Sequence, residues 1–189
     1  MAFVMIKSMK KVLIEGLKLK KEEKFMKIAI IMGSDSDYDV IKKSVKILKE
    51  FEVETEVRVI SAHRTPYKAI EFAENAEQMG FELIIGAAGK AAHLPGVLAG
   101  VSTLPVIGLP IKSSTMDGLD SLLSIVQMPK GVPVATVAIN GAENAALLAV
   151  QILSVKYPEL REKFRAYKKD MAKQVEEKDE KIRLQVKGK

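Results

Sequence analysis

The chain has 189 residues, of which 48% are hydrophobic and 29% charged, a composition typical of one compact domain with a buried core. It contains no cysteine, which excludes disulfides, a catalytic thiolate, iron–sulfur ligation and cysteine-bound zinc. No apolar run approaches the roughly 20 residues that span a bilayer, so we do not expect a membrane protein.

The net charge of +6 is concentrated at the two ends of the chain. Residues 1–26 carry +4, with seven Lys against three Glu, and residues 155–189 carry +5, with 12 basic against seven acidic residues. The body between them, residues 27–154, is left at −3. With no Trp and four Tyr, the chain also offers little aromatic surface for base stacking. We therefore do not expect nucleic-acid binding, and interpret the charge runs as solvated helix faces.

Residues 1–26 mix apolar positions with lysines, which suits a basic amphipathic helix or an unstructured extension. The lysines interrupt the apolar stretch and no Ala-x-Ala pattern follows, so a secretory signal peptide is not expected. We treat this segment as an extension that precedes the domain.

From residue 27 onward, short runs rich in Ile and Val alternate with longer segments of helical periodicity. This alternation predicts βαβ units and an α/β fold around a parallel sheet. The five predicted strands are residues 27–32, 54–60, 82–87, 104–107 and 134–138. Apolar residues at helical spacing predict crossover helices between the first three strands, and further helices are expected after His93, Asp117 and Gly141.

Two helix starts carry capping signals. Thr65 offers a capping hydroxyl before Pro66 at the first helical position, and Ser36 or Asp37 is expected to cap the first helix. Beyond the α/β domain of residues 27–154, the charged segment from Glu159 to about Lys181 predicts a protruding helix that packs on another subunit. Residues 155–189 are thus a charged C-terminal helix and tail.

Polar loops follow the first four predicted strands. Ligands bind outside the carboxyl ends of the strands in an open parallel sheet, so these loops are expected to converge on one rim. The loops are residues 33–37 (GSDSD), 61–65 (SAHRT), 86–93 (GAAGKAAH) and 108–114 (GLPIKSS). The predicted rim carries both histidines of the chain, His63 and His93.

The residue types on this rim suit a phosphate-bearing ligand. Serine hydroxyls and backbone N–H groups at helix N-termini bind phosphate, and Arg64 supplies a bidentate cation. Asp37 is expected either to bind ribose hydroxyls or to orient Arg64. The chain has neither a Walker loop nor a Gly-x-Gly-x-x-Gly turn, and the Gly-Ser-rich first turn alone would equally suit a tight turn without a ligand.

The two histidines are the candidates for proton transfer, because imidazole exchanges protons near neutral pH. Their placement on one rim beside Ser61 and Arg64 favours a functional over a structural role. A metal site is not expected, since the chain lacks the close carboxylate–histidine spacing of metalloenzymes. The glycines Gly86, Gly89 and Gly96 serve either tight turns or close approach of the backbone to a planar ligand.

Four strings occur in order along the chain: MGSDSD, SAHRTP, AAHLPG and DSLLSIVQMPKGVPVATVAI. Together they closely resemble the N5-carboxyaminoimidazole ribonucleotide mutases of de novo purine synthesis, which belong to the class I aminoimidazole ribonucleotide (AIR) carboxylase family. The resemblance covers about residues 27–154. It implies a flavodoxin-like three-layer α/β/α sandwich with a five-stranded parallel sheet. It further implies a cytoplasmic homo-octamer without metal or organic cofactor, functionally linked to an ATP-dependent synthetase that forms the carbamate.

The reaction that the resemblance implies moves a carboxylate from N5 to C4 of aminoimidazole ribonucleotide. The carbamate loses CO2, which stays trapped beside the ring until C4 attacks it, and a proton then leaves C4. By the resemblance, His63 is the catalytic proton shuttle. The residues that the resemblance places around the substrate are Ser34, Asp37, Ser61, Arg64, Ala88, Gly89, His93 and Leu94.

Lys90 departs from the family, which usually has glycine at this position. A cation there would reach the migrating carboxylate, clash with it, or point to solvent, and these alternatives stay open at this stage.

Two other readings of function are weighed against the mutase. The nearest is a carboxylase that adds free CO2 to aminoimidazole ribonucleotide, although the resemblance implies that its loops lack the AHLPG string present here. The other is a non-catalytic phosphate- or nucleotide-binding flavodoxin-like module. A phosphoacceptor receiver would need an aspartate at the end of the third strand, where Gly86 and Ala87 stand, and a flavin carrier would need aromatic residues in the loops.

Overall fold

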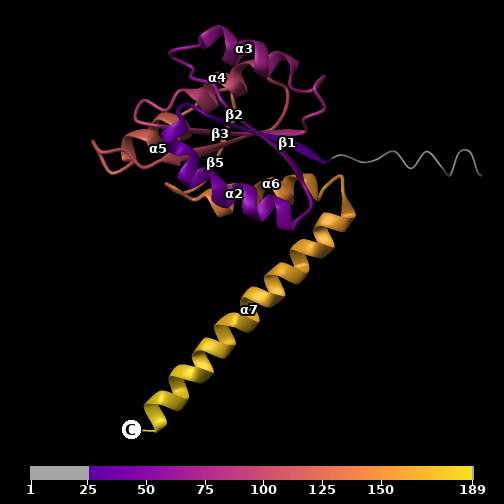
Figure 1. Cartoon of the computed structure of the whole chain (residues 1–189), viewed down its shortest axis with the longest axis vertical. Coiled ribbons are helices and arrows are strands. Elements are labelled where there is room, and N and C mark those ends of the chain that lie inside the picture. Colours follow the sequence, from indigo (N-terminus) through magenta and orange to yellow (C-terminus); the bar gives the residue numbers. More distant parts are fainter. Residues whose placement is uncertain (1–25, 189) are drawn as a thin grey trace, which may run out of the picture.

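The computed structural model of the protein describes residues 26–188, so the predictions for residues 1–25 lie outside the described residues. Five parallel strands form one sheet in the order β2-β1-β3-β4-β5 (Figure 1). The strands are β1 (Lys27–Met32), β2 (Glu54–Val59), β3 (Leu83–Gly89), β4 (Val106–Ile111) and β5 (Ala135–Thr136). β1, β3 and β4 are almost wholly buried, whereas β2 alternates charged and apolar residues because it lies at an edge.

Helices cover both faces of the sheet and make the three layers that the sequence predicts (Figure 1). The residues of β1 alternate between the two faces, as the period of two in a strand requires. Ile28 and Ile30 join one buried cluster, and Ala29 and Ile31 join the other. Each buried isoleucine contributes about 1.5–3 kcal/mol through removal from water.

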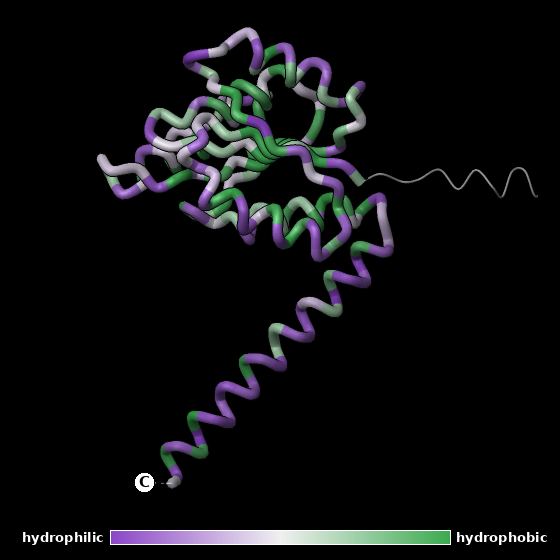
Figure 2. The backbone as a smooth tube through the Cα atoms, in the orientation of Figure 1, coloured by the Kyte–Doolittle hydropathy of each residue, from purple (hydrophilic) through white to green (hydrophobic). Residues whose placement is uncertain are grey.

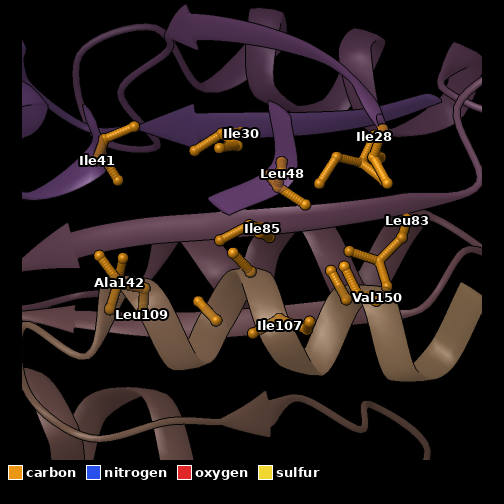
Figure 3. Close-up of a cluster of buried hydrophobic side chains, with 14 of the residues drawn as sticks. Ile28, Ile30, Ile41, Leu48, Leu83, Ile85, Ile107, Leu109, Ala142 and Val150 are labelled. Carbon is orange, nitrogen blue, oxygen red and sulfur yellow. The ribbon is translucent and has the colours of Figure 1, made fainter. Parts of the chain in front are cut away.

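The first cluster lies under α2 (Tyr38–Glu50) and α6 (Ala142–Leu153), and Figure 3 shows Leu83 of β3 beside Val150 of α6. The second lies under α3 (Pro66–Asn75), α4 (Leu94–Val101) and α5 (Leu119–Val126). Within residues 26–188, all predicted helices are present. The five-stranded flavodoxin-like fold is therefore confirmed.

The predicted end of the fourth strand is wrong. β4 continues through Gly108 and Pro110 to Ile111, where the sequence predicted a loop. Gly108 is buried because α5 packs closely there: a Cβ atom at this position would lie 2.3 Å from Cγ2 of Ile125. Pro110 is tolerated because β5 pairs only with Ile107 and Gly108, so no ladder hydrogen bond is lost at the proline.

Smaller boundary changes affect the other strands. β1 has the predicted bounds, β2 ends one residue earlier, β3 runs two residues further through Gly89, and β5 is limited to Ala135–Thr136.

The predicted N-cap positions, Thr65 for α3 and Asp37 for α2, are confirmed, but neither side chain makes the expected capping hydrogen bond. The Thr65 hydroxyl bonds back to the peptide of Ser61, accepting from its N–H at 3.1 Å and donating to its carbonyl at 3.0 Å, so it does not cap α3. At the first helix, Ser34 Oγ accepts from the N–H of Ser36 and caps the 3-10 turn η1 (Asp35–Asp37). Asp37 stands at the N-cap position of α2 without a side-chain capping bond.

The C-terminal helix α7 (Pro158–Lys187) extends away from the body and is longer than the sequence predicted (Figure 1). Its first turns are anchored, since Leu160 is buried and the ring of Tyr167 lies 5.8 Å from that of Phe51. The outer part is mostly hydrophilic, as Figure 2 shows. Within residues 26–188, no helix combines the length and apolar content needed to cross a membrane.

Candidate active site

A pocket of about 520 Å³ opens at the carboxyl ends of β1, β3 and β4. β1 lies between β2 and β3, so the chain leaves β1 toward one edge of the sheet and returns to its other side, which creates the crevice where α/β sheets bind ligands. The pocket is lined by four segments that are far apart in sequence: residues 33–37, 61–64, 88–94 and 111–114.

All nine residues that the sequence analysis assigned to a site line this pocket. They are Ser34, Asp37, Ser61, His63, Arg64, Ala88, Gly89, His93 and Leu94. Parallel strands all end on the same side of a sheet, so loops that follow them meet there whatever their separation in sequence.

His63 and His93 contact each other directly. His63 Nε2 lies 2.8 Å from His93 Nδ1, and the two rings meet edge to face with their centroids 4.9 Å apart. His63 lies in the loop between β2 and α3, and His93 immediately precedes α4. One nitrogen donates and the other accepts, so this contact holds one proton between two imidazoles while the second nitrogen of each ring stays available.

Arg64 ties two loops together. Its Nη2 donates to the carbonyl of Gly33 at 3.0 Å, and its backbone N–H donates to Ser61 Oγ at 3.2 Å. A guanidinium has five N–H donors, so these contacts orient the group and leave donors for an anion. Asp37 was one predicted source of this orientation, but the contacts of Arg64 within residues 26–188 are to Gly33 and Ser61 instead.

The loop after β1 is a network of hydroxyls and carboxylates. Ser36 Oγ donates to Ser34 Oγ at 2.9 Å and lies 3.3 Å from Asp37 Oδ1. Burial raises the pKa of Asp37, with a smaller upward push from the Asp35 carboxylate. Hydrogen bonds from the Ser36 hydroxyl and the Ser34 backbone oppose that rise. The buried carboxylate is thus an acceptor held at the floor of a serine-rich loop.

Lys90 has a φ of 56°, in the left-handed region that glycine adopts without strain. The glycine that the resemblance places here therefore has a physical reason, because the chain must turn sharply from β3 toward His93. A side chain in this conformation costs about 1–2 kcal/mol. Lys90 is exposed and lines the pocket.

The sequence analysis placed residues 108–114 on the predicted rim but assigned none of them to the site, although Lys112, Ser113 and Ser114, which follow β4, line the pocket. Lys112 Nζ pairs with Asp117 at 2.7 Å, and Ser113 Oγ donates to the Asp120 carboxylate at 2.7 Å, so this loop is tied to the start of α5.

Across residues 26–188, no three His, Cys, Asp or Glu side chains are grouped as metal ligands would be. His63 and His93 by themselves would give a metal ion two nitrogen ligands.

A family model for AIR carboxylase matches residues 27–174, which include every residue of the pocket. The chain belongs to the AIR carboxylase family. Similar members of this family carry the name N5-carboxyaminoimidazole ribonucleotide mutase. That of Pyrococcus horikoshii is 61% identical and aligns over 82% of this chain and 88% of its own length. That of Thermotoga maritima is 56% identical over 82% of this chain and 91% of its own length.

Among solved structures, the AIR carboxylase family fold is matched by PurE of Treponema denticola, with a TM-score of 0.76 and 31% identity. The match covers 82% of this chain and 97% of that protein. The outer part of α7, beyond residue 174, lies outside the family model.

Proposed function

We propose that this chain is an N5-carboxyaminoimidazole ribonucleotide mutase, an isomerase of de novo purine synthesis. The observation that carries the proposal is the contact of His63 with His93 inside a pocket that also holds Arg64 and the serine loop. Relatives that bear the mutase name are 52–63% identical to this chain, and the family model covers the whole pocket.

The pocket offers two chemically different ends. The hydroxyls of Ser34 and Ser36 and the guanidinium of Arg64 suit the 5′-phosphate, because a phosphate takes many hydrogen bonds and a cation. Asp37 accepts from the ribose hydroxyls. Near the histidines, Ala88, Gly89 and Leu94 give an apolar wall against which CO2 is held, with Ser61 at its edge.

The reaction needs one proton that is given and then taken back. His63 donates it to the carbamate nitrogen while the N–CO2 bond breaks, and the electron pair of that bond returns to nitrogen. C4 of the electron-rich ring then attacks the CO2 carbon, and the C4 proton passes to His63 as aromaticity returns. Atoms and charge balance, so the net change is an isomerisation that needs no co-reactant.

His93 supports this cycle by orienting His63. The bond between His63 Nε2 and His93 Nδ1 fixes the imidazole ring, so that His63 Nδ1 is the nitrogen left for the substrate. In this proposal His93 is a positioning residue, with a supporting role in the carboxylate site.

The proposal is tested by an absorbance assay with N5-carboxyaminoimidazole ribonucleotide, and separately with aminoimidazole ribonucleotide and bicarbonate. Turnover of the carbamate alone, lost in His63→Asn, supports the mutase. Turnover only with aminoimidazole ribonucleotide and CO2 would establish the carboxylase, the second candidate, whose name the family model carries. Turnover of neither would leave a binding module.

We further propose that residues 27–154 are the catalytic unit, and that α7 packs on another subunit of a homo-octamer. Five apolar side chains on its outer part are exposed: Met171, Val175, Ile182, Leu184 and Val186. A helix of 30 residues is about 45 Å long, and one protomer covers only its first turns. Native mass spectrometry of the full chain and of a chain truncated after residue 170 tests this, since an octamer that survives truncation would contradict it.

The family model and β1 both begin at residue 27, so removal of residues 1–25 is expected to leave activity unchanged. A cytoplasmic location and a functional link to an ATP-dependent synthetase follow from the same proposal, because the carbamate substrate must be made from aminoimidazole ribonucleotide in the same compartment.

A further inference from the structure

Two lysines leave neighbouring strands at the rim of the pocket. Gly89 of β3 pairs with Ile111 of β4, so Lys90 and Lys112, which follow them, stand at the same level on adjacent strands. Both line the pocket. Two positive charges on adjacent strands repel each other unless an anion compensates them.

The two lysines differ in their partners. Lys112 Nζ is neutralised by Asp117 at 2.7 Å. Among residues 26–188, no carboxylate pairs with Lys90 and no hydrogen bond holds its ammonium group. Of the pocket cations, Arg64 is likewise tied, through Gly33 and Ser61. Among the described residues, Arg64 and Lys90 are thus both without a carboxylate partner, and Lys90 differs from Arg64 because no hydrogen bond holds its cationic group.

The backbone at Lys90 adds a second observation. A φ of 56° suits glycine, and glycine would form the same turn without strain. Strained backbone that persists beside a pocket points to a function for the side chain that it carries. Here the side chain brings a positive charge to the edge of the pocket, on the segment that ends in His93.

We propose that Lys90 binds the migrating carboxylate of the substrate, and so sets the preference of the pocket for carboxylated ribonucleotides over uncarboxylated ones. This inference rests on the proposed function. Lys90 is three residues from His93, whose ring contacts His63 at the reacting end, whereas the serine loop lies at the end of β1. An ammonium attracts a carboxylate on N5 or on C4 but gains little from neutral CO2, so it strengthens the binding of substrate and product more than that of the intermediate pair.

Equilibrium binding separates the carboxylate from the phosphate. Calorimetry in a His63→Asn background, which prevents turnover, compares aminoimidazole ribonucleotide with its 4-carboxylated form. Adding Lys90→Gln is expected to lower the affinity for the carboxylated ligand by about tenfold, which is the contribution of one charge-assisted hydrogen bond. The affinity for the uncarboxylated ligand should change by less than about twofold. Lys90→Arg should retain most of the affinity. In the enzyme with His63 intact, Lys90→Gln should raise KM without lowering kcat, because the lost interaction favours the carboxylated ground states.

Lys68→Gln is the matched control, because Lys68 is an exposed lysine of α3 outside the pocket. It measures the effect of losing one charge anywhere on the surface. Equal weakening of both ligands by Lys90→Gln would assign Lys90 to the phosphate and overturn the proposal. No change in either affinity would place the ammonium in solvent and overturn it too. If the protein with Lys90 bound neither ligand, the proposed function itself would fail, a result distinct from both.

Discussion

The two ends of the parallel sheet use their polar residues differently. At the amino end, charged groups pair with one another: Lys27 Nζ lies 3.2 Å from Glu56, and Lys156 Nζ lies 3.1 Å from Glu82, which also accepts from the Tyr157 hydroxyl. At the carboxyl end, Arg64 bonds to a carbonyl and a serine, and the two histidines bond to each other. The charged groups at the amino end are paired within the protein and contribute to stability. The carboxyl end leaves hydrogen-bond donors and an exchangeable proton for a ligand.

Substitution at the carboxyl end should affect activity far more than folding. His63→Asn is expected to lower kcat by about 100-fold or more, because it removes the proposed general acid and base. Its stability should change by less than about 0.5 kcal/mol, since the side chain is exposed. Turnover and thermal unfolding of the same preparation check this. Loss of folding together with activity would remove the contrast between the ends.

Substitution at the amino end should do the reverse. Tyr157→Phe deletes the hydroxyl bonded to Glu82 from a buried ring and should cost about 1–2 kcal/mol of stability. The activity of the folded enzyme should be unchanged. Tyr67→Phe is the control, because Tyr67 is 84% exposed and its hydroxyl is expected to contribute little. Equal unfolding midpoints for the two variants would refute a stabilising role of the Tyr157 hydroxyl.

Lys90 should reverse the usual ranking of alanine and glycine. Alanine normally stabilises a chain relative to glycine, but at a φ of 56° only glycine is free of strain. Lys90→Gly should therefore be more stable than Lys90→Ala by about 1 kcal/mol. Denaturant unfolding of both variants measures the difference, and an alanine variant as stable as the glycine variant would show that the turn relaxes.

Asp37 should show the smallest effect, and one that depends on pH. Burial raises the pKa of Asp37, so the folded state binds its proton more tightly than the unfolded state, and ionisation lowers stability as pH rises. Asp37→Asn should stabilise the protein at neutral pH by less than about 1 kcal/mol while raising KM for the substrate. The stability gain should shrink as pH falls toward the ordinary aspartate pKa of about 3.9. A gain that is constant with pH would assign it to packing instead.

Much of the fold could be predicted because it depends on local patterns. Ile-rich runs such as residues 27–32 form strands wherever both faces are covered, and helical spacing defines the segments between them. The position of the pocket rim could be predicted from the topology, since the loops that follow parallel strands all lie at the same edge of the sheet. Where local pattern and packing disagreed, packing decided: Gly108 and Pro110 have the composition of a loop, but α5 and the short β5 hold them in a buried strand.

The sequence by itself determined the α/β class, the order of the elements and the rim on which the pocket lies, because periodicity and strand direction are properties of contiguous segments. Only the tertiary structure decided which of those residues touch. The 2.8 Å contact of His63 with His93, the anchoring of Arg64 on Gly33, and the left-handed turn at Lys90 each join or bend segments whose relative positions depend on the packing of the whole sheet. No local pattern records such distances, since they are set by residues that are remote in sequence.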